Sequence, residues 1–398
     1  MTAYLDHAST TPLRPEAAAA LVAEMSAVGN PSSLHSSGRR ARRTVEESRE
    51  AVAGALGARP AEVVWTSGGT EADNLAVKGL YWARRAEDPR RRRVLLSASE
   101  HHAVLDPVEW LVRHEDAEVR WLPVDATGRT DLDALRAELA DAPGEVALVS
   151  LMWANNEVGT LQPVAEAAEL AHAAGVPLHT DAVQAVGHLP VDLAATGADA
   201  LSLSAHKFGG PVGAGALLLR RGTALVPLQH GGGQELGARS GTLAAPAARA
   251  TAAALTAAAA GLDEETTRLR ALRAVLLDGL RERVPGLALR GHPTDRLPGN
   301  LHVTVPDCAG DSLLYLLDAA GVECSTGSAC QAGVPQASHV LLAMGLSDEE
   351  AGGALRFSLG WDSTRADVDA ALAAIGPAVE RAQRAAASTR SPRRRKAS

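Results

Sequence analysis

The fold is decided by a short segment, Ser204-Ala205-His206-Lys207-Phe208-Gly209-Gly210. It overlaps an apolar run, residues 200–205, that has the length and composition of a buried strand. The chain holds only three lysines, and arginine supplies the other basic residues. A guanidinium stays protonated and forms no Schiff base, so a lysine kept at a strand end is a candidate for imine chemistry. Since Lys78 lies in a helical pattern and Lys396 in the tail, Lys207 is that candidate.

Around this segment, from Val63 to Leu219, short apolar runs alternate with segments of helical period. The alternation is typical of a mainly parallel sheet with helices on both faces, so we predict an α/β fold. The predicted strands are 62–66, 93–97, 146–153, 176–180, 200–205 and 213–220, and the predicted helices are 71–84 and 164–174. A helical stretch at 243–283 leads into mixed strand and helix signals as far as about residue 387, which suit a second, smaller α/β domain.

Composition narrows the class of protein. With 398 residues, 46% of them hydrophobic, the chain has material for two cores. The net charge is −8 and the basic residues are scattered, so we expect small molecules or proteins as partners, and not nucleic acid. Residues 1–10 lack the basic and apolar regions of a signal peptide, and Pro246 and Arg249 interrupt the alanine-rich run 243–262. We therefore expect neither secretion nor membrane insertion.

The three cysteines are Cys308, Cys324 and Cys330, and none of them has a CxxC partner. So sparse a set argues against a disulfide framework and a self-contained zinc site, and it fits a cytoplasmic location. Cys330 lies in a small, polar stretch, 324–333, where a thiol has the exposure that a nucleophile requires, although structural explanations also exist. Cys324 follows a strand-like run, so we interpret it as structural.

A second motif, Trp65-Thr66-Ser67-Gly68-Gly69-Thr70-Glu71, has the pattern of a strand end, a glycine turn and a helix start. Free backbone N–H groups and a hydroxyl converge in such a turn, which is how proteins cradle phosphate. The alternative is an ordinary turn with Thr70 as the helix N-cap.

Asp181 directly follows the predicted strand 176–180, at the sheet edge where ligands of open α/β folds bind. A carboxylate there can pair with the protonated ring nitrogen of pyridoxal phosphate, and helix capping is the alternative. Lys207, one strand further along, favours the cofactor. Ser204 and His206 are candidates for phosphate contacts or for ordinary core and turn hydrogen bonds.

Two more loops bring polar groups to the same edge. His101 follows the strand 93–97 and is a candidate for stacking on a ring or moving protons, whereas we interpret His102 as a surface loop residue. The loop 153–159 carries Asn155 and Asn156; one amide can meet a ring oxygen or a substrate carboxylate, and the alternative is an Asn-rich turn, to which we assign Asn155. Metal binding is disfavoured, because adjacent histidines seldom aim both rings at one ion.

Arg356 is flanked by apolar residues in the run 355–360. An arginine so placed pairs with a carboxylate, either an internal one or that of a substrate, and the sequence leaves both open.

Together these motifs resemble the cysteine desulfurases of the aminotransferase class V family, in particular the housekeeping group that supplies sulfur for iron–sulfur clusters and tRNA thiolation. The resemblance spans about Tyr4 to Ala385. Its markers, in chain order, are Tyr4-Leu5-Asp6-His7-Ala8, Gly29-Asn30-Pro31-Ser32-Ser33, residues 66–71, Glu100-His101, residues 155–159, Asp181 with Gln184, residues 204–207, Arg239-Ser240-Gly241-Thr242, residues 327–330 and residues 356–360.

The resemblance implies the fold of pyridoxal-phosphate-dependent transferases of fold type I, the aspartate-aminotransferase-like fold, in a homodimer. Its large domain would cover 14–257 and its small domain 1–13 with 258–387. The composition of residues 388–398, with Pro392 and four consecutive basic residues, predicts a disordered tail. Lys207 would hold the cofactor as an imine, Asp181 would pair with its nitrogen and His101 would stack on its ring. The remaining implied contacts are Asn156 and Gln184 to the ring oxygen, and Gly69, Thr70, Ser204, His206 and, from the other subunit, Thr242 to the phosphate.

The resemblance also implies the reaction. Arg356, with Asn156, would bind the carboxylate of L-cysteine, and Cys330 would take its sulfur, leaving L-alanine and a persulfide. Lys207, His101 and Cys330 are thus the implied catalytic residues. The persulfide would pass to acceptors such as an iron–sulfur scaffold or a tRNA-thiolation enzyme, and Cys330 is also the candidate ligand of a transient iron–sulfur cluster.

The chain departs from the family pattern at two points. Gln331-Ala332-Gly333 replaces a frequent Thr-Ser pair, and Ala205 replaces a frequent glycine. Neither change removes a reacting group. The alternatives are a selenocysteine lyase or another class V enzyme, which would depend less on Cys330, and a non-catalytic scaffold that delivers sulfur or clusters.

Overall fold

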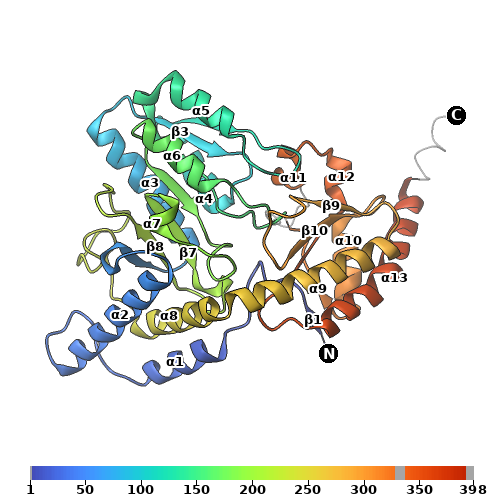
Figure 1. Cartoon of the computed structure of the whole chain (residues 1–398), viewed down its shortest axis with the longest axis horizontal. Coiled ribbons are helices and arrows are strands. Elements are labelled where there is room, and N and C mark those ends of the chain that lie inside the picture. The colour runs from blue at the N-terminus through green and yellow to red at the C-terminus, as the bar shows by residue number, and fades with distance from the viewer. Residues whose placement is uncertain (1, 328–336, 391–398) are drawn as a thin grey trace.

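The computed structural model describes residues 2–327 and 337–390, with side chains as far as residue 386. Its centre is a seven-stranded sheet in the order β2-β8-β7-β6-β5-β3-β4 (Figure 1). Only β8 runs antiparallel to its neighbours, so the predicted α/β architecture with a mainly parallel sheet is confirmed. The strands are β2 Val63–Thr66, β3 Arg93–Ser97, β4 Glu118–Leu122, β5 Val146–Ser150, β6 Leu178–Asp181, β7 Ala200–Ser204 and β8 Gly215–Leu219.

Helices cover both faces of this sheet because its inner strands are buried on both sides. One apolar cluster packs α3 and α4 on one face, and another packs α2, α5, α6 and α8 on the other. The helices of this region are α1 Pro15–Met25, α2 Ser36–Ala55, α3 Gly69–Glu87, α4 His102–Glu115, α5 Leu132–Asp141, α6 Val164–Ala173, α7 Leu193–Thr196 and α8 Ala245–Ala260, with short 3-10 turns at Pro60–Glu62, Pro143–Glu145 and Ala205–Lys207.

The C-terminal elements, orange to red in Figure 1, form a separate body beside the sheet, and α9 runs between the two. This C-terminal body contains a three-stranded antiparallel sheet, β12-β10-β9, and its own apolar cluster. The elements are α9 Leu262–Arg283, β9 Ala288–Arg290, β10 Asn300–Thr304, α10 Gly310–Asp318, β11 Val322–Glu323, α11 His339–Ala343, α12 Asp348–Gly352, β12 Ala354–Ser358 and α13 Arg365–Arg390.

The N-terminus belongs to this second body. Strand β1, Ala3–Tyr4, pairs in parallel with β11, and Ala3 and Leu5 are buried in the C-terminal apolar cluster. The chain then crosses to the large sheet, so residues 6–12 lie between the two bodies. The domain bounds given above stay a prediction.

Three sequence expectations differ from the structure. The helical stretch 243–283 is two helices, which meet at Gly261. The predicted strand 146–153 ends at Ser150, because the chain turns there into the site described below. Helix α13 continues through Arg390, so residues 388–390 are helical, and residues 391–398 lie outside the described part of the chain. In residues 2–327 and 337–390, no helix is both long and apolar enough to cross a membrane.

Candidate active site

A cavity of about 540 Å³ lies at the carboxyl ends of the parallel strands, where residues 6–12 and the C-terminal body meet the large sheet. Ten of the predicted site residues line it together. They are Gly69, Thr70, His101, Asn156, Asp181, Gln184, Ser204, His206, Lys207 and Arg356. The topology explains this convergence, because each of the loops after parallel strands leaves the sheet at the same edge.

Two predicted site residues, Thr242 and Cys330, are not among these ten. Thr242 is exposed, in the long loop between β8 and α8. Cys330 lies outside the described residues, but Gly327 and Ala337, the last described residues before and after its segment, both line the cavity. Cys324 and Cys308 are buried in the C-terminal apolar cluster, and burial raises the pKa of Cys324 to about 12, which agrees with a structural role.

The predicted phosphate cradle is the start of α3. Gly68 is the N-cap, so the alternative with Thr70 as the cap is wrong. A Cβ on Gly69 would lie 2.7 Å from Val183 Cγ2, so glycine is needed where the helix start approaches the loop after β6. The free N–H groups of the first turn of α3, with the hydroxyls of Thr70 and Ser204, give this end of the cavity an anion-binding character.

Asp181 is almost fully buried at the end of β6, and its Oδ1 accepts a hydrogen bond from the backbone N–H of Val183 at 2.8 Å. The next helix, α7, begins at Leu193, so the carboxylate shapes a turn and does not cap a helix. Burial, followed by the charge of Asp73, raises the pKa of Asp181 to about 7. A cation placed against this carboxylate would restore its ionised form.

A buried polar cluster that the sequence did not reveal lies behind Asp181. His179 Nδ1 lies 2.9 Å from Ser150 Oγ, and its Nε2 lies 3.0 Å from Ser202 Oγ and 3.5 Å from Asp73 Oδ1. Burial lowers the pKa of His179 to about 4 and raises that of Asp73 to about 7, so the imidazole is neutral at pH 7. The available signal was spacing: His179 and Asp181 are two apart on one strand and share a face.

Lys207 ends the 3-10 turn after β7. Its Nζ donates hydrogen bonds to the carbonyls of Ala8 at 2.7 Å and Ser9 at 2.8 Å. Burial, followed by the charge of Arg356, lowers the pKa of Lys207 to about 8. The amine therefore has a neutral fraction at neutral pH far larger than that of an exposed lysine.

Residues 6–12, here called the N-terminal segment, form a wall of the site that sequence reasoning noted only as a family marker. Besides receiving the Lys207 bonds, the Ala8 carbonyl accepts a hydrogen bond from Gln184 Nε2 at 2.9 Å. His206 lies 3.1 Å from Thr10 Oγ1 through its Nδ1. Four predicted site residues thus contact this segment: Gln184, His206, Lys207 and Arg356. Its sequence has no periodic pattern from which this position could have been predicted.

His101 is the N-cap of α4, and its Nδ1 accepts from the backbone N–H of Ala103 at 3.1 Å. Burial, then the charge of Lys207, lowers the pKa of His101 to about 4. The ring is therefore neutral beside the amine. His102, interpreted as a surface loop residue, is instead the first residue of α4; it is half-buried, lines the cavity and bonds to Asp106.

The two amides of the loop after β5 lie in different surroundings. Asn155 is fully buried, and its Oδ1 accepts from the backbone N–H groups of Glu157 and Val158 at 2.9 Å each, so its assignment to an Asn-rich turn is confirmed. Asn156 lines the cavity, and its backbone carbonyl accepts a hydrogen bond from Arg356 Nη1 at 3.0 Å.

Arg356 has an internal carboxylate partner, which is one of the two options left open above. Its Nη2 donates to Asp6 Oδ1 at 2.6 Å and to Ser9 Oγ at 2.8 Å. The residue is 3% exposed and still borders the cavity. Within residues 2–327 and 337–390, no group of three or more His, Cys, Asp or Glu side chains is arranged to hold a metal ion.

Comparison with known proteins agrees with this geometry. The model of the aminotransferase class-V family matches residues 3–371. The IscS-like cysteine desulfurase of Mycobacterium tuberculosis (strain ATCC 25618 / H37Rv) is 56% identical over 385 residues, which are 96% of this chain and 98% of that protein. The chain belongs to the cysteine desulfurases of this family.

Other cysteine desulfurases and solved structures give the same result. Cysteine desulfurase IscS of Methanosarcina thermophila is 42% identical over 379 residues, 95% of this chain and 92% of that protein. The solved structure of a NifS-like protein has a TM-score of 0.88 and 35% identity, covering 96% of this chain and 100% of that one. DndA from Streptomyces lividans has a TM-score of 0.75 and 37% identity over 89% and 99% of the two chains.

Cysteine desulfurases of class V depend on pyridoxal phosphate, and the described residues fit that group. The helix start at Gly69 suits a phosphate, and the carboxyl of Asp181 suits a protonated ring nitrogen. The amine of Lys207 lies at the same cavity. An anion site, a buried carboxyl and a partly neutral lysine are the three groups that this cofactor requires.

Proposed function

We propose that this cysteine desulfurase converts L-cysteine to L-alanine and keeps the sulfur as a persulfide on Cys330. The observation that carries the proposal is the common cavity: Lys207, Asp181, His101 and Arg356 line it together, and the chain enters and leaves the Cys330 segment at its wall.

The cofactor, when bound, supplies a sink for the electron pair of the substrate carbon. Lys207 would attach the cofactor covalently, and Asp181 would keep its ring nitrogen protonated. His101, a neutral imidazole that is able to accept a proton, would stack on the ring. Contacts to the ring oxygen and the phosphate are assigned to Asn156, Gln184, Gly69, Thr70, Ser204 and His206.

Substrate binding is assigned to Arg356 with Asn156, which would hold the carboxylate of L-cysteine. The thiolate of Cys330 would then attack the substrate sulfur. A sulfur–sulfur bond forms and the carbon–sulfur bond breaks, and its electron pair stays with the carbon, which takes up a proton. Thiol plus cysteine thereby give persulfide plus alanine, with no external oxidant or reductant.

We assign further features on the same basis. Thr242 would reach the phosphate of a partner subunit in a homodimer, which its exposure in the loop before α8 supports. The names of the IscS relatives support a role in iron–sulfur cluster assembly. A scaffold or a tRNA-thiolation enzyme as sulfur acceptor, and a cytoplasmic location, are further parts of the proposal. Cys330 as ligand of a transient iron–sulfur cluster and the two-domain bounds belong to the same proposal.

The decisive experiment measures alanine released from L-cysteine, and persulfide on the protein, for the wild type and for Cys330→Ala. We expect the variant to bind the cofactor but to lose both products. Cys324→Ala is the matched control, because this thiol is buried in the C-terminal core, and it should keep persulfide formation. Equal alanine release by Cys330→Ala would overturn the nucleophile assignment in favour of a selenocysteine lyase or another class V enzyme. Cofactor binding without any turnover in the wild type would favour a scaffold.

A further inference from the structure

Arg356 has few N–H groups left for a ligand. A guanidinium carries five N–H donors. The two on Nη2 are taken by Asp6 Oδ1 at 2.6 Å and Ser9 Oγ at 2.8 Å, and one on Nη1 is taken by the carbonyl of Asn156. Nε is enclosed and has no hydrogen-bond partner among the described residues. The second N–H of Nη1 is therefore the donor available to a substrate. Because the guanidinium is planar and rigid, the direction of this N–H depends on how Asp6 and Ser9 hold the Nη2 group.

Asp6 is the charged member of that holding group. Its side chain is 22% exposed, while that of Arg356 is 4% exposed, so their contact is a short, charge-assisted hydrogen bond in a mostly dry site. The charge of Asp6 also acts on Lys207, because it raises the pKa of this amine while Arg356 lowers it. Asp6 thus offsets part of the positive charge of Lys207 and Arg356, which border the same cavity.

The backbone around Asp6 is fixed from several sides. Tyr4 donates through its hydroxyl to the carbonyls of Asp6 at 3.2 Å and Thr10 at 2.8 Å. The backbone N–H of Ala8 donates to Ser358 Oγ at 2.9 Å, two residues beyond Arg356 on β12. The carboxylate and its arginine therefore belong to one rigid unit.

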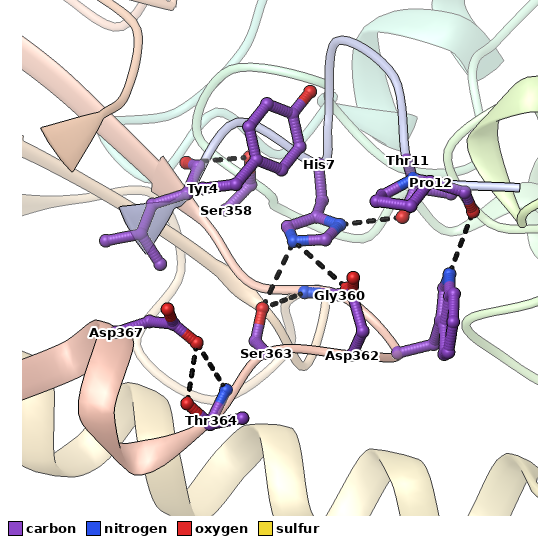
Figure 2. Close-up of polar contacts among 12 residues, drawn as sticks. Tyr4, His7, Thr11, Pro12, Ser358, Gly360, Asp362, Ser363, Thr364 and Asp367 are labelled. Atoms are coloured by element: carbon purple, nitrogen blue, oxygen red, sulfur yellow. Dashed lines mark hydrogen bonds and ion pairs between the residues drawn. The ribbon is translucent and has the colours of Figure 1, made fainter. Parts of the chain in front are cut away.

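His7 anchors this unit to the loop after β12, as Figure 2 shows. Its Nδ1 lies 2.6 Å from Thr11 Oγ1, and its Nε2 lies 3.2 Å from Ser363 Oγ and 3.6 Å from Asp362 Oδ1. Trp361 adds a hydrogen bond from its Nε1 to the carbonyl of Pro12 at 2.9 Å. The N-terminal segment is thus attached near both ends to β12, which carries Arg356, and to the loop that follows β12.

We propose that Asp6 is a positioning residue of this enzyme: it holds the guanidinium of Arg356 so that the free Nη1 donor aims at the substrate carboxylate. The inference rests on the proposed role of Arg356. Asp6 touches neither the sulfur nor the reacting carbon in this scheme, so its contribution is to the binding of cysteine.

The test compares Asp6→Asn and Asp6→Glu with wild-type holoenzyme in steady-state alanine release. For Asp6→Asn we expect KM for L-cysteine to rise about tenfold while kcat changes by less than about twofold, because a misaimed binding group weakens ground state and transition state alike. Asp6→Glu keeps the charge and should raise KM less. Glu323→Gln is the matched control, since it removes an exposed carboxylate from β11, the strand paired with β1, and should leave KM unchanged.

An unchanged KM in Asp6→Asn would overturn the inference, as would equal losses of kcat and cofactor absorbance, which indicate a merely structural role. If Asp6→Asn does not fold, an unchanged KM in Asp6→Glu overturns it instead. Arg356→Lys separates this failure from that of the proposed function. If Arg356→Lys leaves KM unchanged, the substrate role of Arg356 is wrong; if it raises KM while Asp6→Asn does not, only the role of Asp6 is wrong.

Discussion

The amine of Lys207 is buried beside the guanidinium of Arg356, and both effects disfavour its charged form. The carboxylates of Asp181 and Asp6 act in the opposite direction, but burial and Arg356 outweigh them. The pKa of Lys207 is therefore lowered from 10.5 to about 8. Because only a neutral amine attacks an aldehyde, this pKa sets the pH at which the protein can take up its cofactor.

We therefore predict the pH profile of cofactor uptake by the cofactor-free protein. The rate should rise with pH as Lys207 loses its proton and should level off above about pH 8. In Arg356→Gln one cause of the lowered pKa is gone, so the profile should shift to higher pH. Stopped-flow absorbance after mixing with pyridoxal phosphate measures both, and a wild-type profile still rising at pH 10 would contradict the prediction.

At this scale the sequence revealed the residues with distinctive chemistry. Lys207 stood out because arginine had replaced most other lysines, and Asp181 because it followed an apolar strand. Asp6, Asp73 and His179 were not recognised as neighbours of the site. Their contacts join parts of the chain far apart in sequence, and a lone polar residue in a buried strand or loop does not name its partner.

At the scale of elements, buried strands were predictable and the exposed edge was not. Strand β3 has the predicted bounds, because all five of its residues are buried and apolar or paired within the sheet. Strand β4 was missed, since Glu118 and Arg120 are only partly buried at the sheet edge and Trp121 is exposed. The N-terminal segment has no regular structure and owes its place to tertiary hydrogen bonds.

The loop after β12 provides a test of how that segment is anchored. A Cβ on Gly360 would lie 2.0 Å from His7 Nδ1, so Gly360→Ala must displace the imidazole seen in Figure 2. We expect a loss of about 2 kcal/mol in unfolding free energy, as for other overpacked sites, together with a raised KM for cysteine.

Gly54→Ala is the matched control, because a Cβ there meets nothing within 4 Å near the end of α2. It should stabilise the protein slightly, since alanine is the better helix former. Denaturant unfolding and steady-state kinetics measure the two effects, and equal stability of both variants would show that His7 is not a packed anchor.

On the scale of the whole molecule, the three largest apolar clusters of the described residues lie on the two faces of the large sheet and in the C-terminal body. The family resemblance implied the fold type and the domain bounds, whereas periodicity predicted a mainly parallel sheet followed by a second, smaller α/β domain. Neither the resemblance nor periodicity showed how the long loop between β8 and α8, which carries Thr242, is attached to the large domain.

That loop is fixed by a buried ion pair. Glu235 receives two hydrogen bonds from Arg49 of α2, Nη1 to Oε2 and Nη2 to Oε1, each 2.8 Å, and a third from the backbone N–H of Trp65 at 2.8 Å. The side chains of Glu235 and Arg49 are 1% and 9% exposed. The carboxylate thereby connects the loop to α2 and β2.

We predict that Glu235→Gln lowers the free energy of unfolding by about 3 kcal/mol, because it removes the buried counter-charge of Arg49 and leaves only the more exposed carboxylate of Glu46. Glu47→Gln is the matched control: it breaks an exposed pair with Arg249, whose loss should change stability by less than about 1 kcal/mol. Urea unfolding compares the two. If Thr242 serves a partner subunit, Glu235→Gln should also weaken the dimer in sedimentation experiments while Glu47→Gln does not. Equal unfolding midpoints for the two variants would mean that the loop is held by other contacts, such as that between Arg239 and Glu71.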